Sequence, residues 1–274
     1  MEHHFVTAGT DGSRQAFWAV EWAAHEAAMR GATLQLVCVP TNKIIQASEE
    51  VLARAADHAV QAEPALAVET GLRSGPPALA LAKAGAGASL LVVGSGGSDS
   101  DACAALAPGF VSRYVATHAR CPVAVVRDEG TAEHREIVVG VREAGQSAAV
   151  GFAFEEASLR RARVRVVHAW RWLLPAVRPA VTGLRDPAVG DIAAEVARWL
   201  ADSLTFWRDK YPDVDVVEEV VHAPAAHALA ATSAAADLII LGRNVPDEIR
   251  HPESNPIIHA VLNHALCPVA IVPE

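Results

Sequence analysis

Short runs of apolar and β-branched residues alternate along the first half of the chain with longer alanine-rich segments of helical period. The pattern predicts strands at residues 5–10, 33–39, 66–70, 90–93 and 123–126, and helices at residues 14–30, 47–62, 76–84 and 110–118. The first helix carries Ala16, Val20, Ala23, Ala24 and Ala27 on one face and ends at Gly31, a favourable C-terminal cap.

The second half of the chain repeats the first. FVTAGTDGS matches IVVGVREAG, ASLLVVGS matches ADLIILGR, and HARCPVAVVRDE matches HALCPVAIVPE. The second copy has predicted strands at residues 137–141, 164–168, 214–220, 238–241 and 269–272, with an insertion around residues 170–186. Its second helix has Ile192, Val196, Leu200, Leu204 and Trp207 at the spacing of a core face, so we interpret Trp199 and Trp207 as packing residues.

Strict alternation of apolar strands and helices is typical of a parallel sheet that is covered on both faces. The predicted fold class is therefore α/β, with two tandem doubly wound domains at residues 1–128 and 135–274. Each is expected to hold a five-stranded parallel sheet of order 3-2-1-4-5 with helices on both faces. Ligands bind such sheets at the carboxyl ends of the strands, which directs attention to the loops after the first and fourth strands.

Composition and charge exclude several function classes. The formal net charge of -9 over 274 residues argues against a nucleic-acid partner, which would need clustered Lys and Arg. The apolar runs have the length of strands, so no membrane segment is expected, and the N-terminus has no basic start of a secretory signal. We therefore expect a cytoplasmic protein.

Cysteine and histidine patterns offer no metal or nucleophile site. The four cysteines, Cys38, Cys103, Cys121 and Cys267, lack C-x-x-C spacing and are interpreted as thiols, with Cys121 and Cys267 buried at matching strand entrances. Twelve histidines form no H-E-x-x-H motif, and His118 and His264 are matched helix-end residues that can cap carbonyls. No G-x-S-x-G or Walker sequence is present, so no catalytic residue and no metal ligand is assigned.

The glycine and aspartate positions of the first copy follow a known pattern. GTDGS at residues 9–13 ends the first strand, and GSGG at residues 94–97, Gly109 and VSR at residues 111–113 follow the fourth. With HARCPVAVV closing the domain, the sequence resembles the universal stress protein family, whose pattern is an Asp after the first strand and G-x2-G-x9-G-[S/T] after the fourth. In the nucleotide-binding branch of that family, the Asp and a backbone group after the second strand hold adenosine, and the glycine loop wraps the phosphates of ATP.

The resemblance implies an ATP site in the first domain only, with Mg²⁺ if ATP is bound. The positions it assigns to the ligand are Gly9, Asp11, Val39, Val93, Gly94, Gly97, Gly109, Val111 and Ser112. Glycine suits such a loop because backbone N–H groups can approach phosphate oxygens, and a helix N-terminus adds partial positive charge. The sequence departs from the pattern where Phe110 replaces the Ser or Thr and where a longer loop carries Asp99 and Asp101.

The second copy has lost the pattern. Arg142 stands in place of the aspartate, Val245 in place of the second glycine, and Asn255 with Pro256 in place of the final pair. We expect no ATP there. Arg142, Arg243 and Arg250 could still attract another anion, but we favour their interpretation as solvated surface charge.

Three hypotheses for function remain open. The first is a stress-response regulatory protein, not an enzyme, that binds ATP or a related adenine nucleotide. The second is a tandem module for protein interaction that binds no nucleotide. The third is an ATP pyrophosphatase-type enzyme, because SGGSDS at residues 95–100 matches the phosphate loop of that class, although there the motif follows the first strand.

The resemblance also implies how the two domains associate. Members of this family pair through their last strand, so residues 123–126 are expected to pair with residues 269–272 and make the chain its own pseudo-dimer. A further homodimer is a possible assembly.

Overall fold

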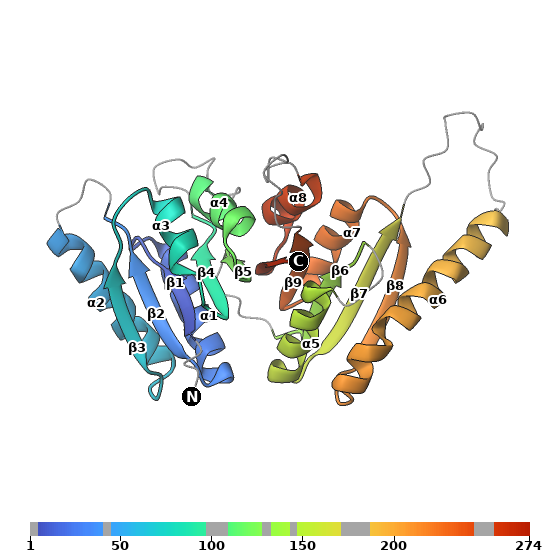
Figure 1. Cartoon of the computed structure of the whole chain (residues 1–274), viewed down its shortest axis with the longest axis horizontal. Coiled ribbons are helices and arrows are strands. Elements are labelled where there is room, and N and C mark those ends of the chain that lie inside the picture. The colour runs from blue at the N-terminus through green and yellow to red at the C-terminus, as the bar shows by residue number, and fades with distance from the viewer. Residues whose placement is uncertain are drawn as a thin grey trace.

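The computed structural model describes residues 5–40, 45–96, 109–127, 133–142, 147–170, 187–243 and 255–274. In that part of the chain, ten strands form one continuous sheet in the order β3-β2-β1-β4-β5-β10-β9-β6-β7-β8 (Figure 1). The strands of the first half are β1 (Phe5–Gly9), β2 (Thr33–Cys38), β3 (Val68–Leu72), β4 (Leu90–Gly94) and β5 (Val123–Val126). Those of the second half are β6 (Glu136–Gly140), β7 (Arg163–Trp170), β8 (Val216–His222), β9 (Leu238–Arg243) and β10 (Val269–Pro273).

Each half has the predicted order 3-2-1-4-5, and the strand pairs inside each half are parallel. The predicted contact between the halves is also confirmed. Strands β5 and β10 pair antiparallel at the centre of the sheet, with Val123 opposite Ile271 and Val125 opposite Val269. The tandem chain therefore forms its own two-domain sheet.

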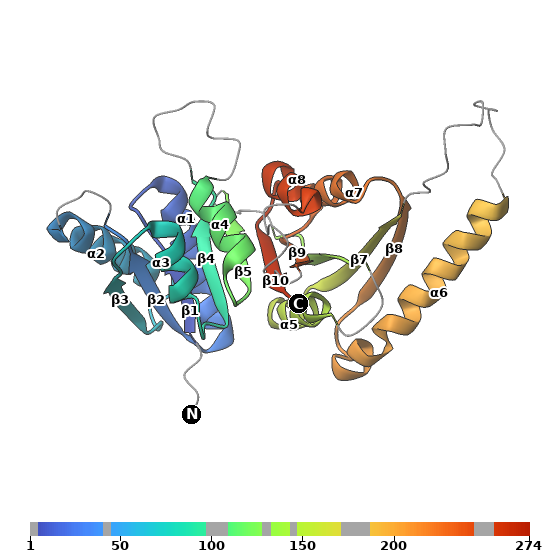
Figure 2. The same ribbon diagram turned by 45° about the horizontal axis from the view of Figure 1, so that its top comes forward.

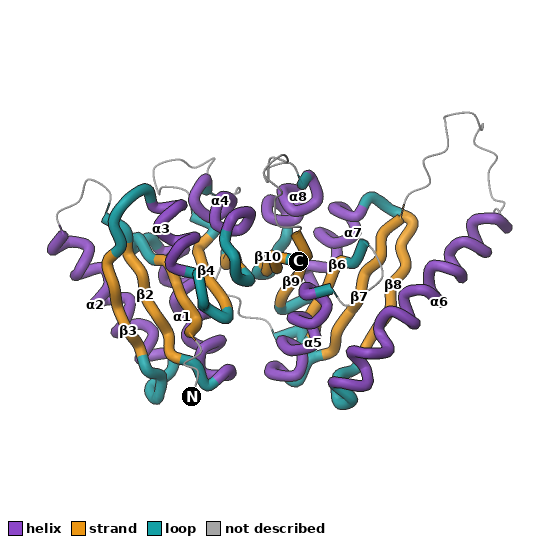
Figure 3. The backbone as a smooth tube through the Cα atoms, viewed as in Figure 1, coloured by secondary structure: helices purple, strands orange, loops and turns teal. Residues whose placement is uncertain are grey.

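Helices cover both faces of this sheet. The first half contributes α1 (Arg14–Arg30), α2 (Ile45–Ala62), α3 (Pro77–Ala84) and α4 (Phe110–His118), and the second contributes α5 (Ala148–Arg160), α6 (Pro187–Lys210), α7 (Ala225–Thr232) and α8 (Pro256–His264). Helices α1, α2, α5 and α6 pack on one face, and α3, α4, α7 and α8 on the other (Figures 2 and 3). Two apolar cores therefore run across both domains.

The local signals in the sequence account for these elements. Ser13 caps α1 by accepting a hydrogen bond from the N–H of Ala16 at 3.3 Å, and Gly31 ends the helix in the left-handed conformation with φ 59°. The alanines and valine of its predicted face are all buried. In α6, Leu200, Leu204 and Trp207 are buried as predicted. A short 3-10 turn (Ser233–Ala235) follows α7.

Two predicted strands begin two residues too early. The structure starts β3 at Val68 and β8 at Val216 because the preceding apolar residue belongs to a turn that closes a helix. The N–H of Leu66 donates to the carbonyl of Glu63, and the N–H of Val214 donates to the carbonyl of Tyr211, each at 3.1 Å. The side chains of Leu66 and Val214 pack against the core from these turns. These residues are apolar because they are partly buried, although they do not belong to a strand.

The α1 and α5 side of the junction is held by two glutamates and two arginines, which we call the seam quartet: Glu26, Arg30, Glu156 and Arg160. Arg30 contacts Glu156, and Arg160 contacts Glu26, so each arginine crosses to the other domain. Each also pairs along its own helix, Arg30 with Glu26 at 3.3 Å and Arg160 with Glu156 at 3.1 Å. Both glutamates are fully buried, and burial raises the pKa of Glu156 to about 7.

The opposite side of the junction uses arginines on helix C-termini. Arg243, at the end of β9, donates to the carbonyl oxygen of Ala116 at 3.1 Å and to that of Ala119, both at the end of α4. In the reciprocal contact, Arg127 donates to the carbonyl oxygen of Leu262 in α8. A cation at a helix C-terminus satisfies free carbonyls and opposes the negative end of the helix dipole.

The interpretation of Arg243 as solvated surface charge is therefore wrong. Its side chain is 5% exposed and lies inside the junction between the two domains. Arg142 is exposed as predicted, and Arg250 lies outside the described residues. The sequence gives no sign of the contact because Arg243 and its two acceptors are 127 and 124 residues apart.

The described cysteines are buried thiols, as predicted. Burial raises the pKa of Cys121 to about 11, so this thiol stays protonated and unreactive near neutral pH. Cys103 lies outside the described residues. Among the helices that the structure describes, none is long and apolar enough to cross a membrane.

Candidate functional site

The candidate site lies where three neighbouring strands of the first domain end. Strands β2, β1 and β4 are adjacent and parallel, so their carboxyl ends share one edge of the sheet (Figure 1). Val39 follows β2, Asp11 follows β1, and the glycine loop follows β4. The topology therefore brings together the three segments that the sequence assigned to one ligand.

A tight turn presents Asp11. Its carboxylate accepts a hydrogen bond from the N–H of Ser13 at 2.9 Å, and Gly12 follows with φ +81°, a conformation that favours glycine. The Asp11 side chain is exposed at the start of α1. This carboxylate is held in place by the backbone and faces solvent at the sheet edge, where it can accept further hydrogen bonds.

The glycine loop leaves the sheet after β4 and returns to the same place. The N–H of Ser95 donates to the carbonyl of Val126 at 2.7 Å, and the N–H of Gly109 donates to the carbonyl of Ser95 at 2.8 Å. The second bond closes the loop and sets the start of α4 beside the end of β4. Gly97, Asp99 and Asp101 lie outside the described residues.

The start of α4 has no side-chain cap in the part of the chain that the structure describes. Gly109 is the N-cap residue and no side chain of the described chain accepts a hydrogen bond from the first turn. The hydroxyl of Ser112 is buried and donates to the carbonyl of Gly109 at 3.0 Å. The first N–H groups of α4 carry the partial positive charge of a helix N-terminus and have no side-chain acceptor among the described residues. Phe110 is 65% exposed at this point.

Several predicted site residues also have a packing role. A Cβ on Gly9 would lie 2.9 Å from the side chain of Leu81, and a Cβ on Gly94 would lie 2.7 Å from the backbone oxygen of Gln15. Gly94 is therefore required for packing whether or not a ligand binds, because backbone cannot move aside, whereas a side chain at position 9 would need only the end of Leu81 to shift. The side chains of Val93, Val39 and Val111 pack in the core on the α3 and α4 side, and Val93 itself lies in the sheet between Gly9 and Val125.

The matching edge of the second domain satisfies its own polar groups. Asn255 caps α8, with its side-chain oxygen accepting from the N–H groups of Ile257 at 3.1 Å and Ile258 at 3.3 Å. Pro256 removes another donor. The side chain of Glu274 accepts from Ser147 Oγ at 2.6 Å and from the N–H of Ala148 at 2.8 Å, at the start of α5. The Glu274 carboxylate thus occupies the N-terminus of α5.

The role of Glu274 could not be predicted from the sequence, since it lies 127 residues from Ser147 and no motif joins them. The prediction that His118 meets a helix-end carbonyl is confirmed. Its Nδ1 lies 2.9 Å from the carbonyl oxygen of Tyr114, and its ring stacks on the Tyr114 ring at 3.9 Å between centroids. In the described part of the chain, no three His, Cys, Asp or Glu side chains gather as a metal site.

Comparisons with known proteins agree with this architecture. The sequence model of the universal stress protein family matches residues 5–127 and 133–273. Universal stress protein Rv2005c of Mycobacterium tuberculosis is 31% identical over 297 residues, which span 100% of this chain and 98% of that protein. Universal stress protein Rv2623 of the same organism is 31% identical over 259 residues, 86% of this chain and 85% of that protein.

A solved structure supports the fold along the whole chain. A universal stress protein from Archaeoglobus fulgidus superposes with a TM-score of 0.70 and covers 100% of this chain and 99% of its own, at 15% identity. At that identity the likeness concerns the fold. The two-domain arrangement seen here is therefore shared with an independent structure.

Proposed function

Because the chain belongs to the universal stress protein family, we propose that it is a non-enzymatic stress-response protein whose N-terminal domain binds ATP or a related adenine nucleotide. The proposed site is the edge formed by Asp11, Val39, the glycine loop and the start of α4. The second domain is proposed to be its structural partner. Mg²⁺ would accompany the triphosphate.

One contrast between the two domains carries the proposal. The N-cap position of α4 is Gly109, with no side chain capping the helix among the described residues, whereas the matching position of α8 is Asn255, whose side chain occupies two of the helix donors. A glycine N-cap has no side chain that could accept hydrogen bonds from the helix donors. Among the described residues, the first turn of α4 therefore has donors available for the proposed phosphates, whereas Asn255 takes up two donors of α8.

The residues of this edge fit the parts of a nucleotide. The N–H groups of the first turn of α4 suit the phosphates, as helix N-termini commonly bind such groups. The Asp11 carboxylate suits a ribose hydroxyl, and the backbone after β2 at Val39 suits adenine, as the family resemblance implies. Mg²⁺ would be held largely by phosphate oxygens and water, as is usual for nucleotide-bound magnesium.

Phe110 weakens this site. It stands where the family pattern has a Ser or Thr, so one hydroxyl contact to phosphate is missing. A hydrogen bond to a charged group contributes about 1.5–3 kcal/mol, so affinity is expected to be lower by roughly 10- to 100-fold than with a hydroxyl at this position. Phe110→Ser should therefore tighten nucleotide binding.

Calorimetric titration of the full chain with Mg-ATP tests the proposal. We expect one site per chain, weakened in Asp11→Ala and unchanged in Glu195→Ala, which removes an exposed acid from α6 in the other domain. Gly109→Asn copies the cap of α8 onto α4 and should abolish binding while slightly raising the free energy of unfolding. Absence of heat with the unaltered chain at millimolar nucleotide would refute the proposal.

The exposed ring of Phe110 favours a second candidate function, a tandem module for protein interaction that binds no nucleotide. Nucleotide released from the purified and then denatured chain would count against it. The ATP pyrophosphatase hypothesis is addressed by pyrophosphate release. A rate that is unchanged in Ser95→Ala combined with Asp99→Ala would remove it.

A further inference from the structure

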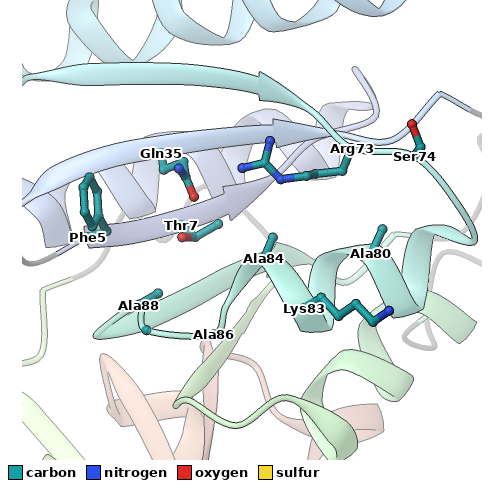
Figure 4. A pocket seen from close by; sticks show the side chains of 11 residues that line it. Phe5, Thr7, Gln35, Arg73, Ser74, Ala80, Lys83, Ala84, Ala86 and Ala88 are labelled. Atoms are coloured by element: carbon teal, nitrogen blue, oxygen red, sulfur yellow. The ribbon is translucent and has the colours of Figure 1, made fainter.

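The open pocket between α3 and the sheet of the first domain does not bring its cations together. Arg73 and Lys83, two of the residues that line it, point away from each other (Figure 4). A buried cation lies instead at the neighbouring helix, α4, and it comes from the other domain. Arg243 is 5% exposed and contacts the last residues of α4. The start of the same helix belongs to the proposed nucleotide site.

The position of α4 depends on what surrounds it. The helix is only nine residues long. Isolated helices shorter than about 12–15 residues are marginal in water, so a helix of this length relies on packing and on the groups that satisfy its ends. Two of its buried residues, Val115 and Ala116, belong to the core that also contains Leu262 and Val269 of the second domain. The second domain therefore helps to set the position of α4.

Arg243 satisfies two carbonyl groups at the end of α4. Its Nε donates to the carbonyl oxygen of Ala116 at 3.1 Å, and its Nη2 donates to that of Ala119. Within the helix, the Thr117 hydroxyl donates to the carbonyl oxygen of Arg113 at 2.8 Å. The planar guanidinium is a rigid fork, so its two hydrogen bonds hold the end of α4 in one place.

The repeat shows which position of the first domain corresponds to Arg243. ASLLVVGS of the first copy matches ADLIILGR of the second, so Arg243 matches Ser95. In the first domain, Ser95 begins the glycine loop, and its carbonyl accepts a hydrogen bond from the N–H of Gly109 at 2.8 Å. The second domain thus uses a position of its own degenerate loop to hold α4 of the first domain.

The matching helix of the second domain, α8, is held differently. Arg127, which follows β5, donates to the carbonyl oxygen of Leu262 in α8. The start of α8 has its own cap, because the Asn255 side chain accepts from two N–H groups of the first turn. The start of α4 has Gly109 as its N-cap, with no side-chain cap among the described residues. The first turn of α4 therefore depends more on how the rest of the helix is held.

We propose that Arg243 is a positioning residue of the nucleotide site, so that the site in the first domain is complete only when the second domain is docked. This inference rests on the proposed function, because it concerns the same site. Nine residues of helix span about 13 Å and fewer than three turns. Loosening of the last turn by loss of Arg243 therefore also loosens the first turn, whose N–H groups are the proposed phosphate donors.

The coupling acts in both directions. A nucleotide that binds best to a fully ordered α4 also stabilises the contact between α4 and Arg243, because coupling between two sites is reciprocal. Nucleotide binding in the first domain is therefore expected to tighten the domain junction. The second domain has lost the nucleotide pattern, but through Arg243 it responds to the nucleotide of the first.

Calorimetric titration of Arg243→Met and Arg127→Met with Mg-ATP tests the proposal. Each variant removes an arginine from a helix C-terminus at the junction, but only Arg243 contacts the helix of the proposed site. We expect Arg243→Met to lower the affinity at least about fivefold, which is a coupling of ordinary size, and Arg127→Met to leave it unchanged. Arg243→Lys keeps the charge without the fork and should give an intermediate affinity.

Hydrogen exchange of the full chain without nucleotide provides an independent measurement. The N–H of Arg113 donates to the carbonyl of Gly109 at 3.2 Å and reports on the first turn of α4. Its exchange should be faster in Arg243→Met than in the unaltered chain, and unchanged in Arg127→Met. All titrations are made at a temperature at which the unfolding curves show each variant to be folded, so that a lower affinity does not come from unfolded chains.

Three results would overturn the inference and leave the proposed function intact. One is binding of Mg-ATP to Arg243→Met with the affinity of the unaltered chain. Another is an equal loss of affinity in Arg243→Met and Arg127→Met, which would indicate a general effect of the junction. The third is unchanged exchange of the Arg113 N–H in Arg243→Met. Absence of binding to the unaltered chain would instead refute the proposed function, and the inference with it.

Discussion

Removal of one arginine from the seam quartet should strongly destabilise the chain. The Arg30 side chain is 7% exposed and contacts Glu156, Glu155 at 2.8 Å and Glu26 at 3.3 Å. In Arg30→Met, two fully buried carboxylates share the single guanidinium of Arg160. Breaking a buried ion pair from one side costs about 3–5 kcal/mol, because a charge is left without compensation.

A matched control separates this effect from ordinary surface charge. Glu155 also pairs with Arg30, but its side chain is 48% exposed. Exposed pairs contribute at most about 1 kcal/mol, so Glu155→Gln should change the free energy of unfolding by less than that. Urea unfolding of both variants at one pH above the pKa of Glu156, where this carboxyl group is charged, provides the comparison.

The reasoning also predicts the result of removing every charge of the quartet. Replacing all four residues by Leu or Met of similar volume leaves no uncompensated charge, so stability should return to within about 1 kcal/mol of the starting chain or exceed it. If Arg30→Met is as mild as Glu155→Gln, the quartet is hydrated and the argument fails. If the fourfold variant is as unstable as the single one, the cost does not come from an unpaired buried charge.

Three further predictions concern stability. Burial raises the pKa of Glu156 from 4.5 to about 7, so the stability gained from its protonated form is complete below about pH 4.5 and is lost as pH rises through 7. Glu156→Gln should make the free energy of unfolding, measured with urea at several pH values, less dependent on pH in this range. Arg243→Met leaves the buried carbonyls of Ala116 and Ala119 without a donor and should cost about 1–3 kcal/mol by the same assay, whereas a surface arginine would cost almost nothing. Gly151→Ala places a Cβ against the Trp207 ring, closer than van der Waals contact, and should cost about 1–3 kcal/mol with a change in tryptophan fluorescence; an unchanged spectrum would contradict this prediction.

Local signals made most of the fold predictable. The spacing of apolar residues, the glycine after α1 and the repeated segments predicted the elements and their order, because these depend on near neighbours and on the repeat. The pairing of β5 with β10 was predicted from the family resemblance alone. The starts of β3 and β8 were predicted two residues too early, because Leu66 and Val214 are apolar residues of a turn and cannot be distinguished in the sequence from the first residues of a strand. The insertion at residues 170–186 lies outside the described residues, apart from Trp170.

The seam quartet was missed, although the sequence carries a signal for it. Glu26 lies seven residues after the buried Ala19, on the apolar side of α1. In α1 this acid is followed four residues later by Arg30, and the same spacing recurs in α5 at Glu156 and Arg160. A charged pair at a core position that repeats in both copies indicates a contact between the copies. Arg243 offers no comparable signal, since its acceptors are backbone carbonyls, which every residue has.

The two domains differ in where their polar groups find partners. At the junction they are reciprocal, because each contributes a glutamate and arginine pair on one side and an arginine on a helix C-terminus on the other. Away from the junction, Asn255 caps α8 in the second domain, whereas no side chain of the described residues caps α4 in the first. The proposed phosphate site would lie at the start of α4, and Arg243 of the second domain contacts the end of the same helix. Because α4 is nine residues long, the proposed site and the domain junction lie at the two ends of one short helix.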